Sequence, residues 1–175
     1  MGRVATFVAV ALLLAGNLSS SALSSGGVAV AKVPHPPLSP AKRAKAEALK
    51  NEANELFKAK KWEEALSLYE QAAETDPSNI MILCNRAFAH IKLENFENAV
   101  ADAEQSILLD PTFPKAYYRR ATARMMQGKL KLALNDLRKV TRLRPSDAAV
   151  HDKLRECEKM WRVQVCRIGC GHEAH

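Results

Sequence analysis

Five cationic and amide side chains recur at spacings that would place them on one surface. Lys50 and Asn54 are four residues apart, and so are Lys115 and Arg119, so each pair shares one face of a helix. Asn85 takes the corresponding place in the stretch between them. Ammonium and guanidinium groups hold carboxylates, and amides bond to carboxylate or backbone oxygens. The pattern predicts a site that grips an acidic ligand.

A second group of potential ligands ends the chain, where Cys166, Cys170, His172 and His175 form a C-x3-C-x-H-x2-H pattern. These residue types suit zinc, but their spacing matches no common finger, so we expect no metal. A Cys166–Cys170 disulfide in an oxidising lumen and a disordered tail over 166–175 are the alternatives. Cys84 and Cys157 fit helical core positions instead.

Catalytic and cofactor signals are missing from the sequence. It has no Ser-His-Asp arrangement, P-loop or glycine-rich phosphate site, and only seven glycines. The net charge of +7 comes mostly from residues 1–45, which contain five basic residues and no acidic one. No aromatic-interleaved basic face accompanies this charge, so we do not expect nucleic-acid binding. We expect a non-enzyme without cofactors.

The elements that must position the five polar residues repeat along the chain at a fixed period. Small residues and a closing proline recur at this period: Ala53, Ala87 and Ala121; Ala65, Ala99 and Ala133; Pro77, Pro111 and Pro145. In this the chain resembles tetratricopeptide repeat proteins, whose repeat length is about 34 residues. The resemblance implies an all-α fold, a short right-handed solenoid of helix hairpins in which the first helix of each hairpin faces a groove.

The repeat array is expected over residues 46–165. It comprises repeats at 46–79, 80–113 and 114–147, and a capping helix at 148–165 with one apolar and one polar face. Asp76-Pro77 and Asp110-Pro111 predict turns after the second helices. Gly128 marks the turn inside the third hairpin, where the first two repeats carry Lys60 and Glu94.

Within this family, the five polar residues match the dicarboxylate clamp of chaperone-binding domains. The resemblance implies that Lys50, Asn54, Asn85, Lys115 and Arg119 hold the C-terminal Glu-Glu-Val-Asp of the ninety- and seventy-kilodalton heat-shock chaperones, as a co-chaperone adaptor does. Lys92 could add a further contact. We expect Lys115 and Arg119 to project into solvent, and Arg120 to point away from the groove, so that Arg120→Ala should affect tail binding little.

The segments NRAFAHIKLE (85–94), KAYYRRA (115–121) and LRECEK (154–159) resemble the N-terminal domain of serine/threonine protein phosphatase 5. Glu94 matches an acidic residue that contacts the catalytic domain there, although it could equally be a polar turn residue. Two alternatives to the adaptor follow. The chain could be a truncated or spliced regulatory domain of such a phosphatase, or a repeat scaffold that binds an unrelated peptide or helix.

Residues 1–22 have the order of a signal or targeting peptide. A cationic start precedes an apolar run over 4–16 and a Ser-x-Ala site that ends at Ala22. The run is short for a membrane span, so no stable span is expected after cleavage. Residues 23–45 then form a linker rich in Pro and Ser. The secretory pathway and the plastid are the predicted destinations, or the cytoplasm if the leader is an anchor or an artefact of gene prediction.

Overall fold

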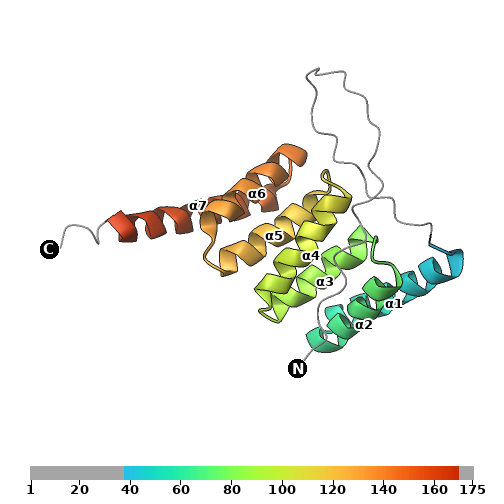
Figure 1. The fold of residues 1–175 in the computed structure, drawn as a ribbon. Helices are drawn as coiled ribbons and strands as arrows, with labels where there is room; N and C mark the ends of the chain where they lie inside the picture. Colours follow the sequence, from blue (N-terminus) through green and yellow to red (C-terminus); the bar gives the residue numbers. More distant parts are fainter. Residues whose placement is uncertain (1–37, 170–175) are drawn as a thin grey trace, which may run out of the picture. The chain divides into compact units, whose positions relative to one another are not determined.

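The computed structural model describes residues 38–169, and this part of the chain consists of seven helices without a strand. They form three consecutive hairpins and a final helix, so the fold is an all-α solenoid (Figure 1). Each helix packs against the next one in the chain. The helices are α1 (Pro40–Lys58), α2 (Trp62–Thr75), α3 (Ile80–Lys92), α4 (Phe96–Leu109), α5 (Pro114–Met126), α6 (Leu130–Leu143) and α7 (Ala148–Gly169).

Helix α1 begins at Pro40, ahead of the start expected for the repeat array at 46. Ser39 caps it, because its side chain accepts a hydrogen bond from the backbone N–H of Lys42, and Pro40 occupies the first turn. Proline, which has no backbone N–H, suits that turn because an N–H there would have no partner within the helix. A proline that reads as part of a stiff linker in the sequence is therefore the start of a helix. At the other end, α7 starts at the expected position and continues beyond 165.

The turn inside each hairpin uses a left-handed backbone residue. The φ angles are +64° at Lys60, +60° at Glu94 and +72° at Gly128. These three positions are separated by one repeat length each, so the turn geometry repeats even where the residue is not glycine. Side chains at positive φ are strained by about 1 kcal/mol, which a glycine avoids. Lys60 and Glu94 thus replace glycine in the first two repeats without a change in the turn.

The turns between hairpins follow the predicted Asp-Pro chemistry. The Oδ1 atom of Asp76 accepts the backbone N–H of Ser78 at 3.3 Å and its hydroxyl at 2.9 Å. Asp110 does the same for Thr112, at 2.8 and 2.6 Å. Each carboxylate therefore fixes the bend that the following proline requires.

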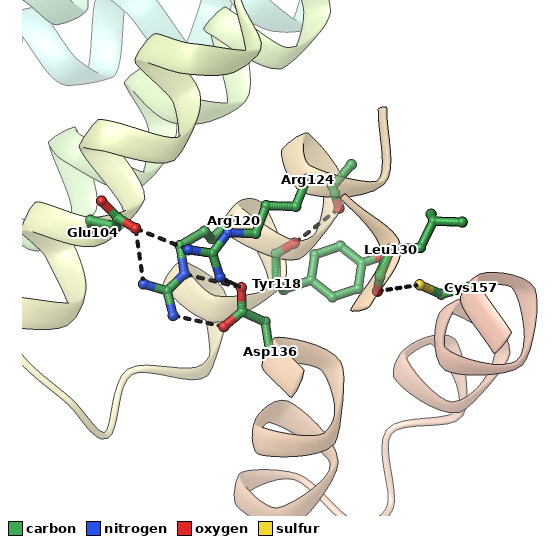
Figure 2. Close-up of polar contacts among 8 residues, drawn as sticks. Glu104, Tyr118, Arg120, Arg124, Leu130, Asp136 and Cys157 are labelled. Atoms are coloured by element: carbon green, nitrogen blue, oxygen red, sulfur yellow. Dashed lines mark hydrogen bonds and ion pairs between the residues drawn. The ribbon is translucent and has the colours of Figure 1, made fainter. Parts of the chain in front are cut away.

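The core is built from the periodic alanines and the residues between them. All six alanines that repeat in the two helices of each hairpin are fully buried, and so are Cys84 and Cys157, as the sequence predicts. The thiol of Cys157 on α7 lies 3.7 Å from the carbonyl oxygen of Leu130 on α6, as Figure 2 shows. This contact joins α7 to the first residue of α6, next to the turn at Gly128.

The expected leader, residues 1–22, lies outside the described residues, as do Cys170, His172 and His175. Cys166 is exposed on α7. Among residues 38–169, no group of three or more His, Cys, Asp or Glu side chains is placed to hold a metal. None of the helices in this range has the length and hydropathy needed to cross a membrane.

Candidate functional site

The two predicted asparagines meet between α1 and α3. The Nδ2 group of Asn85 donates a hydrogen bond to Oδ1 of Asn54 at 3.0 Å. The hydroxyl of Tyr69 on α2 donates to the same oxygen at 2.7 Å, and burial raises the pKa of this phenol to about 12. With its oxygen occupied twice, Asn54 presents its NH2 group as the free part of the amide. An amide donor beside Lys50, one turn away, suits a carboxylate.

Lys50 already has a carboxylate neighbour on its own helix. Its ammonium group is hydrogen-bonded and ion-paired to Glu47, and its side chain is only 14% exposed. Glu47 is half exposed, with 50% of its side-chain surface accessible. A ligand carboxylate at Lys50 would therefore compete with an internal one.

Lys115 and Arg119 form the second part of the site, on α5. Burial lowers the pKa of Lys115, and the positive charge of Arg119 adds to this shift. Burial also lowers the pKa of Arg119. No ion pair or hydrogen bond joins either side chain to a carboxylate anywhere in residues 38–169. Within this range, the two cations thus lie close together without a carboxylate bonded to either one.

The expectation that Arg119 projects into solvent is wrong. Its guanidinium carbon lies 3.5 Å from the centre of the Phe88 ring on α3, and its Nε atom is buried without a hydrogen-bond partner. A flat guanidinium stacks readily on an aromatic face, which the sequence spacing of the charged residues does not reveal.

Phe88 belongs to a group of three aromatic side chains from three helices. Its ring centre is 4.8 Å from that of Phe57 on α1, which in turn lies 4.6 Å from Trp62 on α2 in an edge-on arrangement. The ammonium of Lys92 lies 5.4 Å from the Phe88 ring and 5.8 Å from that of Trp62. Lys92 is therefore directed to the aromatic group and, like Arg119, has a cation–π contact.

A hollow of about 550 Å³ adjoins Lys115 and Arg119. Its other charged residues are Arg144 and Asp147, and its apolar walls are Met81, Phe113, Pro114, Tyr118, Val140, Ala149 and Val150. The hollow therefore offers an apolar surface beside two cations.

Arg120 points to a different set of partners. It donates to Asp136 on α6 through Nε at 3.0 Å and Nη2 at 2.7 Å, and Arg124 donates to the same carboxylate at 2.7 Å (Figure 2). Both arginines also reach Glu104 on α4, at 3.4 and 3.0 Å. Asp136 is only 4% exposed. Arg120 is off the groove as expected, but it is a structural residue, so Arg120→Ala is not a neutral control.

The same arrangement occurs one repeat earlier. Arg86 donates to Asp102 through Nε at 2.8 Å and Nη2 at 2.5 Å. His90 stands where the next repeat has Arg124; it is 6% exposed, and its Nε2 lies 3.9 Å from Asp102. The Nδ1 atom of His90 is buried without a hydrogen-bond partner.

The structure thus links Asn54 to Asn85 directly and leaves Lys115 and Arg119 as neighbours, whereas Lys50 contacts Glu47. Sequence reasoning missed the roles of Phe88, Tyr69 and Glu47. For Phe88 a signal existed: it stands one repeat length after Asn54, as Arg119 does after Asn85. The two contacts are therefore repeats of one another, with a hydrogen bond in the first and a stacked cation in the second.

Comparisons with known proteins agree with this architecture. A family profile described as "TPR repeat" matches residues 53–94, and one described as "Tetratricopeptide repeat" matches 82–113 and 114–147. Serine/threonine-protein phosphatase 5 of Rattus norvegicus is 41% identical over 131 residues, covering 75% of this chain. The chain spans about a quarter of that relative, since the match covers 26% of its length.

Two solved structures extend the comparison. The first TPR of Spaghetti (RPAP3), bound to the HSP90 peptide SRMEEVD, is 32% identical with a TM-score of 0.66, and the match covers 69% of this chain and 95% of that one. The second TPR domain of human RPAP3, in complex with the HSP70 peptide SGPTIEEVD, is 34% identical with a TM-score of 0.64, with coverages of 67% and 98%. The period of the sequence, the seven helices and these matches together show that the chain belongs to the tetratricopeptide repeat family.

Proposed function

We propose that this protein is a co-chaperone adaptor that binds the acidic C-terminal tail of heat-shock chaperones. Lys50, Asn54, Asn85, Lys115 and Arg119 are the proposed clamp. Similar domains have been solved with peptides that end in Glu-Glu-Val-Asp, which supports this class of ligand. The tail brings several carboxylates to a surface that offers cations and amide donors.

One observation carries the proposal: Lys115 and Arg119 lack a carboxylate partner within residues 38–169, whereas three other arginines of α3 and α5 have one. Arg86, Arg120 and Arg124 are all paired with aspartate. Partly buried cations that remain unpaired in the empty protein lose solvation without compensation. A ligand carboxylate would supply that compensation, so binding there is favoured over binding at the paired arginines.

The site divides into two halves that suit two carboxylates. Lys50, Asn54 and Asn85 would hold the terminal carboxylate, and Lys115 with Arg119 would hold a second one further along the tail. The apolar hollow beside Lys115 would then take the side chain that precedes the acidic residues, methionine or isoleucine in the two peptides. The length fits, because packed helices lie about 8–10 Å apart and an extended chain advances about 3.3 Å per residue.

We also propose that residues 46–165 act as a binding module without catalysis of their own. The profile matches fall on repeats, which supports this reading. A regulatory segment of a longer phosphatase is the second candidate, favoured by the 41% identity to serine/threonine-protein phosphatase 5. The transcript and genomic sequence beyond His175 would distinguish the two, since only the second requires a catalytic region there.

Isothermal calorimetry with SRMEEVD and SGPTIEEVD tests the proposed adaptor function. We expect micromolar binding, about −7 to −8 kcal/mol, that weakens when salt rises from about 50 to about 500 mM. Amidating the peptide C-terminus should remove most of it, because the clamp needs the free carboxylate. Lys115→Ala should abolish measurable binding, and Lys131→Ala, an exposed cation on α6, should not change it. Equal binding of free and amidated peptides would contradict the clamp and favour an unrelated peptide or helix.

A further inference from the structure

We infer that Phe88 is a positioning residue for ligand binding, because its ring holds the guanidinium of Arg119 in place for a carboxylate. The inference rests on the proposed tail-binding function and adds to it a residue that no charge pattern marks. The contact is direct, with 3.5 Å between the guanidinium carbon and the ring centre.

The stack leaves only part of Arg119 available. Its Nε atom is buried and has no partner, whereas its two terminal nitrogens are not among the buried unpartnered atoms. An aromatic ring accepts the cation's face but cannot neutralise its charge, as Asp136 does for Arg120. Phe88 can therefore order the guanidinium and still leave its terminal N–H groups and its charge for a ligand.

Repeat symmetry places Phe88 in the binding surface. Asn85 contacts Asn54 across the α1–α3 boundary, and one repeat length later Arg119 contacts Phe88 across the α3–α5 boundary. One geometric relation between adjacent repeats thus serves both halves of the proposed clamp. In the first half the residue on the earlier helix, Asn54, is a clamp amide. In the second half the residue on the earlier helix, Phe88, is a ring that supports the clamp cation.

Two further aromatic rings support the ring of Phe88. Phe57 packs on Phe88 and Trp62 packs on Phe57, so the support extends through α1 and α2. A flexible arginine would lose side-chain freedom on binding, and a stacked one has lost most of it already. Removing the ring should therefore weaken tail binding by about three- to tenfold without removing any direct contact to the ligand.

The binding test uses the full chain and SRMEEVD in calorimetry. Phe88→Leu should weaken binding by about three- to tenfold, and Phe88→Tyr should restore it, because tyrosine keeps the aromatic face. Phe57→Leu is the matched comparison: it removes the neighbouring ring and leaves the direct contact between Phe88 and Arg119, so it should weaken binding less than Phe88→Leu does. Urea unfolding of each variant measures its stability.

A double-mutant cycle separates positioning from a general structural role. In an Arg119→Lys background, where the flat stack is absent, Phe88→Leu should have little further effect. In a Glu47→Gln background, which leaves Arg119 unchanged, Phe88→Leu should weaken binding by the same factor as in the wild type, about three- to tenfold. Equal losses in both backgrounds, or equal losses for Phe57→Leu and Phe88→Leu, would overturn the inference.

A second readout needs no ligand. The side-chain proton signals of Arg119 should be shifted by the aromatic ring in the free protein and should return towards ordinary arginine positions in Phe88→Leu, as measured by NMR. Unshifted signals in the wild type would overturn the stack even if the tail binds. Shifted signals with no tail binding would instead contradict the proposed function.

Discussion

Arg120 holds the carboxylate of Asp136 through two hydrogen bonds, of 3.0 and 2.7 Å, that connect α5 to α6 (Figure 2). Arg86 and Asp102 form the same bond pair between α3 and α4. The partners have the same separation along the sequence in both pairs, and the second pair follows the first by one repeat length. The same ion pair thus occurs in the second and third hairpins, where it joins the two helices of each hairpin.

Replacing Asp136 by asparagine should destabilise the fold by about 2–4 kcal/mol, because two largely buried arginines lose their shared carboxylate. The side chains of Arg120 and Arg124 are only 17% and 14% exposed. Urea unfolding measures the loss. Glu158→Gln is the matched control, since this carboxylate lies 3.9 Å from Arg138 at the surface, and it should cost less than about 0.5 kcal/mol. Equal effects would mean that burial of the pair is unimportant.

Stability should fall as the pH drops below about 6.5, and His90 should account for part of the fall. Burial lowers the pKa of His90, opposed by the charge of Asp102; Arg86 lowers it further and Glu70 raises it. The unfolded chain then binds the proton at a higher pH than the folded one, so acid favours unfolding.

Urea unfolding at about pH 5.5 and about pH 7.5 checks the role of His90. His90→Gln, which cannot titrate, should lose less stability over this interval than the wild type. His151, which is only partly buried, is present in both proteins and cancels in the comparison. An unchanged pH dependence in the variant would show that other groups cause it.

Removing the carboxylate of Glu47 should strengthen tail binding. Glu47 is paired with Lys50, so a ligand carboxylate must displace it, and its negative charge repels an acidic tail. Glu47→Gln should therefore raise the affinity about two- to fivefold, as expected for a partly exposed charge pair. Calorimetry at low salt measures it, with Glu55→Gln, a carboxylate paired with Lys58 on the same helix, as the control. Weaker binding after Glu47→Gln would imply that Glu47 orients Lys50 for the ligand.

Arg144 should make the protein discriminate between the two chaperone peptides. The sixth residue from the end is arginine in SRMEEVD and threonine in SGPTIEEVD. Arg144 lines the hollow with Lys115 and Arg119, against the single carboxylate of Asp147, so a peptide arginine there meets net positive charge. Like charges at close range suppress the wrong partner.

We therefore expect SGPTIEEVD to bind more tightly, and Arg144→Glu to shift the ratio of the two affinities towards SRMEEVD by about three- to tenfold at low salt. Calorimetry with both peptides measures the ratio, and Arg142→Glu, an exposed arginine of α6 outside the hollow, is the control. The peptide SAMEEVD should bind the wild type better than SRMEEVD does. If the ratio of the affinities for SGPTIEEVD and SRMEEVD is the same in the wild type and in Arg144→Glu, the tail does not reach Arg144.

The amino-acid sequence alone determined the all-α class, the period and the positions of the buried alanines. These follow from local periodicity, because each hairpin must bury the same face against the next. The constant repeat length also placed the five clamp candidates on equivalent first helices. Ser39 and Pro40 show the limit of local reading, since a capping residue with proline in the first turn resembles a linker until the helix is seen.

Only the tertiary structure decided which side chain lies against each of two adjacent arginines. Arg119 and Arg120 are neighbours in sequence, yet one stacks on Phe88 and the other pairs with Asp136. The difference arises because successive residues on α5 face different helices, α3 on one side and α6 on the other. Sequence spacing indicates which residues share a face. The identity of the side chain opposite, a ring or a carboxylate, depends on how helices from different repeats pack.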